Sequence, residues 1–162
     1  MRNINNIGFG EKYVTYYDYK NMMQTYRVNL TETEGIIENQ RAIKDDEEIS
    51  CIRKACKITD DCFEYLKTFI KKGMTEKEIA FEIERYMITN GASGHNSSMP
   101  HAIPTTRKIK EGDIIILDFG CKYKGYCSDM TRTVFIDYVE DMYKEVYELV
   151  LKNNKMTIND IK

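Results

Sequence analysis

Apolar residues recur at every third or fourth position in three stretches of this chain, and this spacing predicts three amphipathic helices. The first begins in the acidic run 45–48, where negative charge favours a helix N-terminus, and ends at Gly73. The second opens with a capping box at 75–78, a threonine followed three residues later by a glutamate, and ends at Asn90. The third carries its apolar positions within 139–150.

A continuous apolar run at 114–117 predicts a buried β-strand between the second and third helices. A second strand ends in the apolar run 134–136, and the pair Lys124-Gly125 fits the two-residue turn of a hairpin that joins the two strands. The pattern therefore predicts an α+β fold, with an antiparallel sheet whose central hairpin, 113–136, is packed by the three helices.

Two aspartates interrupt the apolar framework of this hairpin. With Lys124-Gly125 as the turn, Gly120 lies opposite Asp129, and Asp118 shares that face because it is two residues from Gly120. The two carboxylates are then diagonal cross-strand neighbours, with Cβ atoms roughly 7–8 Å apart. Like charges so placed repel unless a cation lies between them, and one divalent ion, or a pair about 3.5–4 Å apart, fits the gap. The alternative, two solvated aspartates near a hairpin end, stays open on the pattern alone.

The first 34 residues hold short elements with too little apolar surface for a core of their own. The sequence predicts strands at 13–17 and 28–30, with a short helix at 18–26 between them. Residues 35–43 form a connector with helical character.

Both histidines fall in a polar loop between residues 91 and 113. Loops on a rigid scaffold often carry functional side chains, and His101 is the better candidate of the two. A surface histidine without a role is the alternative.

Composition narrows the function classes. The net charge of −2 gives no reason to expect nucleic-acid binding. No apolar run is long enough to span a bilayer, and the N-terminus lacks the apolar core of a signal peptide. Five cysteines form no C-x-x-C pair, which favours reduced thiols over disulfides or a zinc site. We therefore expect a cytoplasmic protein that binds neither nucleic acid nor membrane.

Two familiar motifs are present only as fragments. Asp118-Phe119-Gly120 matches the magnesium-binding tripeptide of protein kinases, but no glycine-rich loop or His-Arg-Asp loop accompanies it. Ser128 has an acidic neighbour, but nothing places a histidine beside it, so a serine triad is unsupported.

A longer series of motifs is more specific. The run Ser128-Asp129-Met130-Thr131-Arg132-Thr133 follows a strand that carries Asp118-Phe119-Gly120. Before them, in order, come residues 41–49, Gly73-Met74-Thr75-Glu76, Asn90-Gly91-Ala92, Pro100-His101 and Gly112-Asp113. This series resembles the pita-bread metallopeptidases, most closely the Xaa-Pro aminopeptidase and proline dipeptidase branch. The resemblance covers about residues 35–155.

The resemblance implies half of a pita-bread (creatinase/aminopeptidase-like) fold. It also implies two domains: residues 1–34 are a remnant of the creatinase-like N-terminal domain, and residues 35–162 are the first half of the catalytic domain. Asp118 and Asp129 correspond to the first two ligands of a dinuclear site that usually holds manganese, cobalt or zinc. His101 corresponds to a catalytic histidine in the substrate pocket.

The implied reaction is hydrolysis of the N-terminal Xaa-Pro bond of short peptides. In the family, a metal-bridging hydroxide attacks the peptide carbonyl, the metals polarise that carbonyl, and a glutamate helps to move the proton.

The chain departs from the family pattern in three respects. The ligand histidine and two ligand glutamates of the family's second half have no counterpart, so two of five metal ligands remain. The segment between Gly94 and Asn96 is short by about one strand, roughly 5–10 residues. The N-terminal domain is only a remnant. We therefore expect a truncated peptidase with partial or no metal binding and no activity alone.

A non-catalytic binding module that keeps part of the fold is the alternative function, and metal binding distinguishes the two. Half of a fold also leaves apolar sheet and helix surface uncovered, which predicts a homodimer or a larger homo-oligomer.

Overall fold

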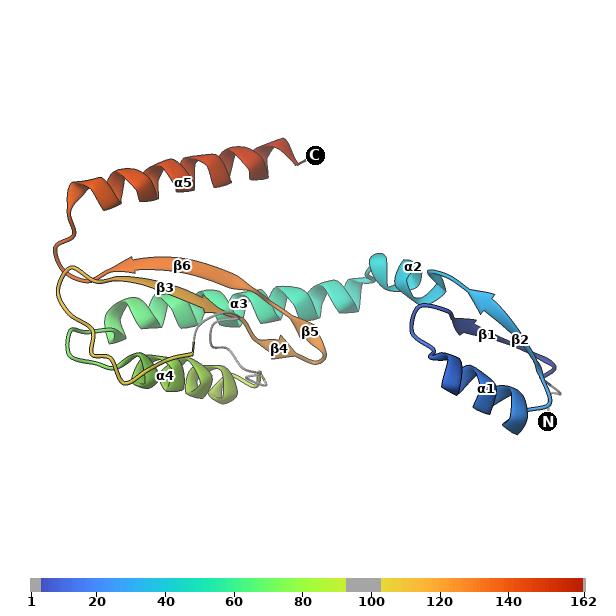
Figure 1. The fold of residues 1–162 in the computed structure, drawn as a ribbon. Coiled ribbons are helices and arrows are strands. Elements are labelled where there is room, and N and C mark those ends of the chain that lie inside the picture. Colours follow the sequence, from blue (N-terminus) through green and yellow to red (C-terminus); the bar gives the residue numbers. More distant parts are fainter. Residues whose placement is uncertain (1–3, 93–102, 162) are drawn as a thin grey trace. The chain divides into compact units, whose positions relative to one another are not determined.

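The chain forms two compact units, Met1–Asp45 and Asp46–Lys162, in the computed structural model (Figure 1). The structure describes residues 4–92 and 103–161. The elements follow in the order β1 (Asn6–Gly10), α1 (Tyr16–Thr25), β2 (Asn29–Thr33), α2 (Ile36–Ala42), α3 (Asp46–Phe69), α4 (Glu76–Thr89), β3 (Ile114–Phe119), β4 (Lys122–Tyr123), β5 (Tyr126–Cys127), β6 (Met130–Phe135) and α5 (Asp141–Asp160).

The first unit is a parallel strand pair, β1 with β2, joined through α1. The predicted helix and second strand are confirmed within two to three residues, and the helical character of the connector appears as α2. The predicted strand at 13–17 is wrong. Thr15 instead caps α1, where its hydroxyl accepts a hydrogen bond from the Asp18 backbone N–H at 3.2 Å. No described residue of this unit is buried, as expected from its small apolar content.

The second unit is built on α3 and α4. The capping box of α4 is present: the Glu78 backbone N–H donates to the Thr75 hydroxyl at 3.2 Å, and the Thr75 N–H donates to the Glu78 carboxylate at 2.6 Å. The end predicted for α3 is wrong by four residues, because the helix stops at Phe69. Gly73 lies in the following turn with φ +95°, and its N–H donates to the Ile109 carbonyl at 2.9 Å.

The hairpin has the register that the sequence predicts. β3 pairs antiparallel with β6, with Asp118 opposite Thr131, and the short pair β4–β5 continues the hairpin to its turn. Lys124 and Gly125 both have positive φ, +47° and +94°, as a two-residue hairpin turn of type I′ requires.

The β3–β6 pair has two different faces, because opposed residues of antiparallel strands point to the same side. One face, which we call the helix-covered face, packs Leu117, Phe119 and Met130 into the core with α3 and α4. The other, which we call the carboxylate face, carries Asp118. Its members are Ile114, Ile116, Asp118, Thr131, Thr133 and Phe135.

Helix α5 lies on the carboxylate face (Figure 1). It touches the sheet where the ring of Tyr147 meets that of Phe135 edge-on, with centroids 5.4 Å apart. None of its residues is buried. The third predicted helix is therefore confirmed from residue 141 onward, with its apolar side chains mostly exposed, whereas Val139 lies before the helix and is buried.

Candidate metal centre and the adjoining groove

The hairpin brings Asp118 and Asp129 to one face. Asp118 is near the end of β3 and half-buried, whereas Asp129 is exposed and directly precedes β6. Since Asp118 pairs with Thr131, two residues beyond Asp129, the two aspartates are diagonal neighbours on the carboxylate face. The structure therefore brings together the two acids that the sequence singles out.

Gly120 makes this arrangement possible. A Cβ atom built at Gly120 lies 2.1 Å from the carbonyl oxygen of Ser128 and 3.3 Å from the Cα of Asp129. Any larger residue would push the two arms of the hairpin apart at the level of the carboxylates. Glycine is therefore the one residue that fits at the third position of the Asp118-Phe119-Gly120 tripeptide without a steric clash.

Thr131 restrains the Asp118 carboxylate. Its hydroxyl donates a hydrogen bond to Asp118 Oδ1 at 2.8 Å. This bond occupies one lone pair and leaves the other oxygen, Oδ2, open for a cation. The threonine belongs to the motif run of the sequence, but its contact with Asp118 depends on the register.

The described residues supply only part of a metal site. They contain no group of three or more His, Cys, Asp or Glu side chains placed to hold an ion. Carboxylates are suitable donors for divalent ions, but each ion needs about four to six donors. Asp118 and Asp129 offer four oxygens at most. The other predicted site residue, His101, lies outside the described residues.

A polar cluster that the sequence does not reveal anchors the hairpin to α3. The hydroxyls of Thr59 and Ser128 are 2.5 Å apart, and the Cys121 backbone N–H donates to Ser128 Oγ at 3.1 Å. Thr59 is fully buried and also donates to the Ala55 carbonyl at 3.1 Å. In the sequence, this cluster is indicated only by Thr59, a threonine that occupies one of the apolar positions of α3.

A second anchor lies at the turn of the hairpin. The Tyr126 hydroxyl donates to the Glu48 carboxylate at 2.6 Å. Together with the Thr59–Ser128 pair, it fixes the hairpin along α3, from the first turn of the helix to its middle. The positions of Asp118 and Asp129 therefore depend on this helix.

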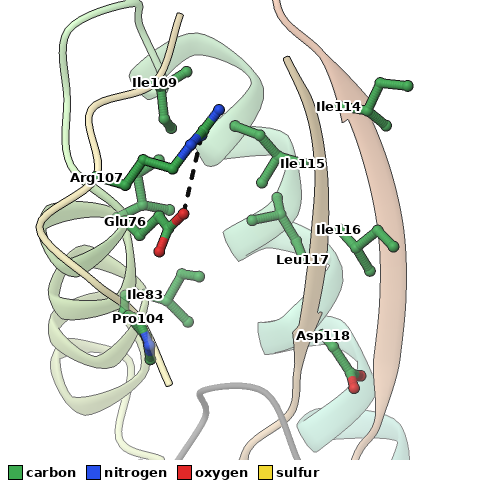
Figure 2. Close-up of a pocket in the computed structure, with 12 residues that line it drawn as sticks. Glu76, Ile83, Pro104, Arg107, Ile109, Ile114, Ile115, Ile116, Leu117 and Asp118 are labelled. Atoms are coloured by element: carbon green, nitrogen blue, oxygen red, sulfur yellow. Dashed lines mark ion pairs between the residues drawn. The ribbon is translucent and has the colours of Figure 1, made fainter. Parts of the chain in front are cut away.

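An apolar groove of about 280 Å³ runs between β3 and α4 (Figure 2). Ile79, Ile83, Ile109 and Leu117 form its buried floor. Asp118 lies at one end of the groove, so the groove adjoins the candidate metal centre.

Ionic contacts secure the rim of this groove. Arg107 pairs with Asp113 at 2.7 Å and approaches Glu76 at 4.0 Å, the pair drawn in Figure 2. The Thr105 backbone N–H donates to Glu76 at 2.9 Å, and this bond is the main cause that lowers the pKa of Glu76. The Arg107 guanidinium likewise lowers the pKa of Asp113. The carboxylates of Glu76 and Asp113 are therefore held in their charged form.

Comparison with known proteins identifies the family. Residues 50–162 match the model of metallopeptidase family M24. The uncharacterized peptidase YqhT of Bacillus subtilis (strain 168) is 37% identical over 98% of this chain and 48% of its own length. The Xaa-Pro dipeptidase of Pyrococcus horikoshii is 33% identical over 84% of this chain and 42% of its own length.

Solved structures agree with the sequence match. The Xaa-Pro dipeptidase from Bacillus anthracis superposes with a TM-score of 0.80 and 35% identity, covering 91% of this chain and 44% of the other. The chain belongs to metallopeptidase family M24, and its fold is half of the pita-bread fold. It spans about half the length of the curated relatives it matches. In the described part of the chain, no helix is both long and apolar enough to cross a membrane.

Proposed function

We propose that this chain is the first half of a metal-dependent peptidase that cleaves the N-terminal Xaa-Pro bond of short peptides. The observation that carries the proposal is the diagonal placement of Asp118 and Asp129 on the carboxylate face, with Thr131 holding Asp118. The relatives named Xaa-Pro dipeptidase support the substrate class.

Asp118 and Asp129 would hold the divalent ions, for which manganese, cobalt and zinc are the candidates. A bound ion supplies Lewis-acid chemistry for peptide hydrolysis. Within this chain, Gly120 permits the close approach of the two strands and Thr131 fixes one carboxylate. His101 is proposed as the residue that contacts the scissile peptide.

The described residues do not complete the coordination of such ions, so we derive no hydrolytic step for this chain alone. We expect the purified chain to show no turnover of Xaa-Pro peptides with added Mn²⁺. Robust metal-dependent turnover would contradict this expectation.

Calorimetric titration with Mn²⁺ tests the proposed ligands. We expect weak binding that Asp118→Asn and Asp129→Asn each reduce at least tenfold. Asp60→Asn, which removes an exposed carboxylate on α3, should change the affinity less than twofold. Equal effects of all three substitutions would reject a site at the hairpin.

A non-catalytic binding module is the second candidate. The incomplete ligand set among the described residues and the open apolar groove favour it. In that case Mn²⁺ does not bind measurably and the Asp118→Asn chain behaves like the unmodified one. The metal titration therefore separates the two functions.

We further propose a homo-oligomer in the cytoplasm. All five cysteines are free, in keeping with a reducing compartment. The uncovered apolar residues of α5 favour association with a second copy.

A further inference from the structure

Among residues 4–92 and 103–161, nothing pairs with the backbone hydrogen-bonding groups along the outer edge of β3. Along this hairpin the Ile136 N–H donates to the Asp113 carbonyl at 3.0 Å, and the Ser128 N–H donates to the Cys121 carbonyl at 2.9 Å. Hydrogen-bonded pairs alternate along an antiparallel ladder, so the odd-numbered residues of β3 bond to β6. The even-numbered ones, Ile114, Ile116 and Asp118, direct their N–H and C=O groups outward. In the described part of the chain, β6 is the one strand paired with β3.

The apolar groove lies directly beside this edge. Ile115 and Leu117 project from β3 toward α4, whereas Ile114 and Ile116 project to the other side (Figure 2). A strand added to the edge would direct every second side chain into the groove, against Ile79 and Ile83. The free edge and the groove thus offer the two things an added strand needs, backbone partners and an apolar pocket.

The relatives contain more residues in the matched region than this chain does. The match to YqhT spans 174 positions, yet this chain contributes 98% of its 162 residues. The match to the Pyrococcus horikoshii dipeptidase spans 149 positions and uses 84% of this chain. More than ten positions of each relative therefore face a gap in this chain. More than ten residues are enough for one strand of about five to six residues and the segments that connect it.

We propose that the free edge of β3 and the adjoining groove form a docking site for one extended peptide strand supplied by another molecule. The strand is free of acidic residues and carries β-branched or aromatic side chains at alternate positions. This proposal does not depend on metal binding or on peptidase activity.

Charge and space define the occupant further. Glu76, Asp113 and Asp118 line the site or border it, and Arg107 is already paired with Asp113. An acidic peptide would therefore be repelled, and basic residues at its ends would be favoured. A second copy pairing through its own β3 would bring its own helices beneath the shared sheet, where α4 already lies. A single strand avoids this conflict.

The test uses the full chain and a fluorescein-labelled capped peptide, Lys-Thr-Val-Ser-Ile-Thr-Val-Lys, followed by fluorescence anisotropy. We expect saturable binding, weakened at least tenfold by Ile116→Pro. Proline at this position removes an outward N–H and leaves the bonds to β6 intact. The matched control is Thr133→Pro, which removes an outward N–H from β6 opposite Ile116 and should change the affinity less than threefold.

Amide hydrogen exchange of the unmodified chain provides a second measurement, which does not require the proline variant to fold. Saturating peptide should slow exchange at Ile114, Ile116 and Asp118 at least tenfold and leave Ile115 and Leu117 unchanged. A peptide with glutamate in place of both lysines should bind at least fivefold more weakly.

Three results would overturn the proposal. They are the absence of saturable binding, binding equally sensitive to both proline substitutions, and a dimer that Ile116→Pro dissociates and the peptide does not disrupt.

Discussion

At Gly120 the two arms of the hairpin leave no space for a side chain. The Ser128 oxygen that a Cβ would meet belongs to the backbone, so it cannot rotate away. Overpacking of this kind costs about 3 kcal/mol. We expect Gly120→Ala to lower the free energy of unfolding by about that amount, measured by urea denaturation.

The matched control for this substitution is Gly125→Ala in the turn. A Cβ added at Gly125 has nothing within 4 Å, but the residue has φ +94°, so alanine there incurs only backbone strain, about 1 kcal/mol. A loss at Gly120 no larger than that at Gly125 would show that the hairpin relaxes around the new methyl group.

Glu82 on α4 is a buried charge that its partners stabilise. Its side chain accepts hydrogen bonds from Arg85 Nε at 2.8 Å and from the Tyr65 hydroxyl at 2.7 Å, and the bond from Arg85 is the main cause that lowers the pKa of Glu82. Hydrogen bonds to a charged group contribute about 1.5–3 kcal/mol. We expect Glu82→Gln to lower the free energy of unfolding by that amount at pH 7.

The pH dependence of this loss follows from the direction of the shift. A carboxyl whose pKa is lower in the folded state stabilises the protein above its unfolded pKa, about 4.3 for glutamate, and loses that contribution as the pH falls through the folded pKa. The difference between Glu82→Gln and the unmodified chain should therefore shrink below pH 4. Glu84→Gln, at an exposed position of the same helix, should change stability by less than about 0.5 kcal/mol at any pH.

At the residue scale, the sequence predicted the register that places Gly120 opposite Asp129, because a two-residue turn fixes the register of both strands. The observed pairing of Asp118 with Thr131 belongs to that register. It did not predict Thr59 or the Tyr126–Glu48 bond. Those contacts join residues far apart in the chain, and their presence depends on how the hairpin packs on α3. The roles of Asp118, Asp129 and His101 remain predictions.

At the scale of elements, α3 and the hairpin should behave as one unit because Thr59 and Ser128 join them. A double-mutant cycle with Thr59→Val and Ser128→Ala isolates this contact. We expect a coupling energy of about 0.5–1.5 kcal/mol from urea unfolding of the four proteins. Strictly additive losses would mean that the two hydroxyls stabilise the fold separately.

Elements with strong periodicity were predicted within a few residues, whereas β1, which has no such pattern, was missed. The apolar spacing and the capping box located α4, since both signals are local. The strand β1 was missed because two of its five residues are glycines, and the tyrosines at 13–17 imitate a strand. Within 13–17, Thr15 caps the N-terminus of α1, so the chain enters a helix there and not a strand.

At the scale of the whole molecule, the exposed apolar residues of α5 are the main reason to expect that two copies of the chain associate. Val146 is 56% exposed and Leu149 62% exposed, and Met142 and Val150 lie on the same side of the helix. The sequence predicted these positions as a helix face but could not show whether anything in this chain covers them. A face of this kind buried between two copies would stabilise a dimer.

We therefore expect light scattering at micromolar concentration to give a mass above the 19.1 kDa of one chain. The double substitution Val146→Gln and Leu149→Gln should shift the mass toward the monomer, because it removes apolar area without adding charge. Glu148→Gln with Lys155→Gln alters the opposite side of α5 and should leave the mass unchanged. A monomer before any substitution would reject association at this concentration, and equal dissociation by both pairs would place the interface elsewhere.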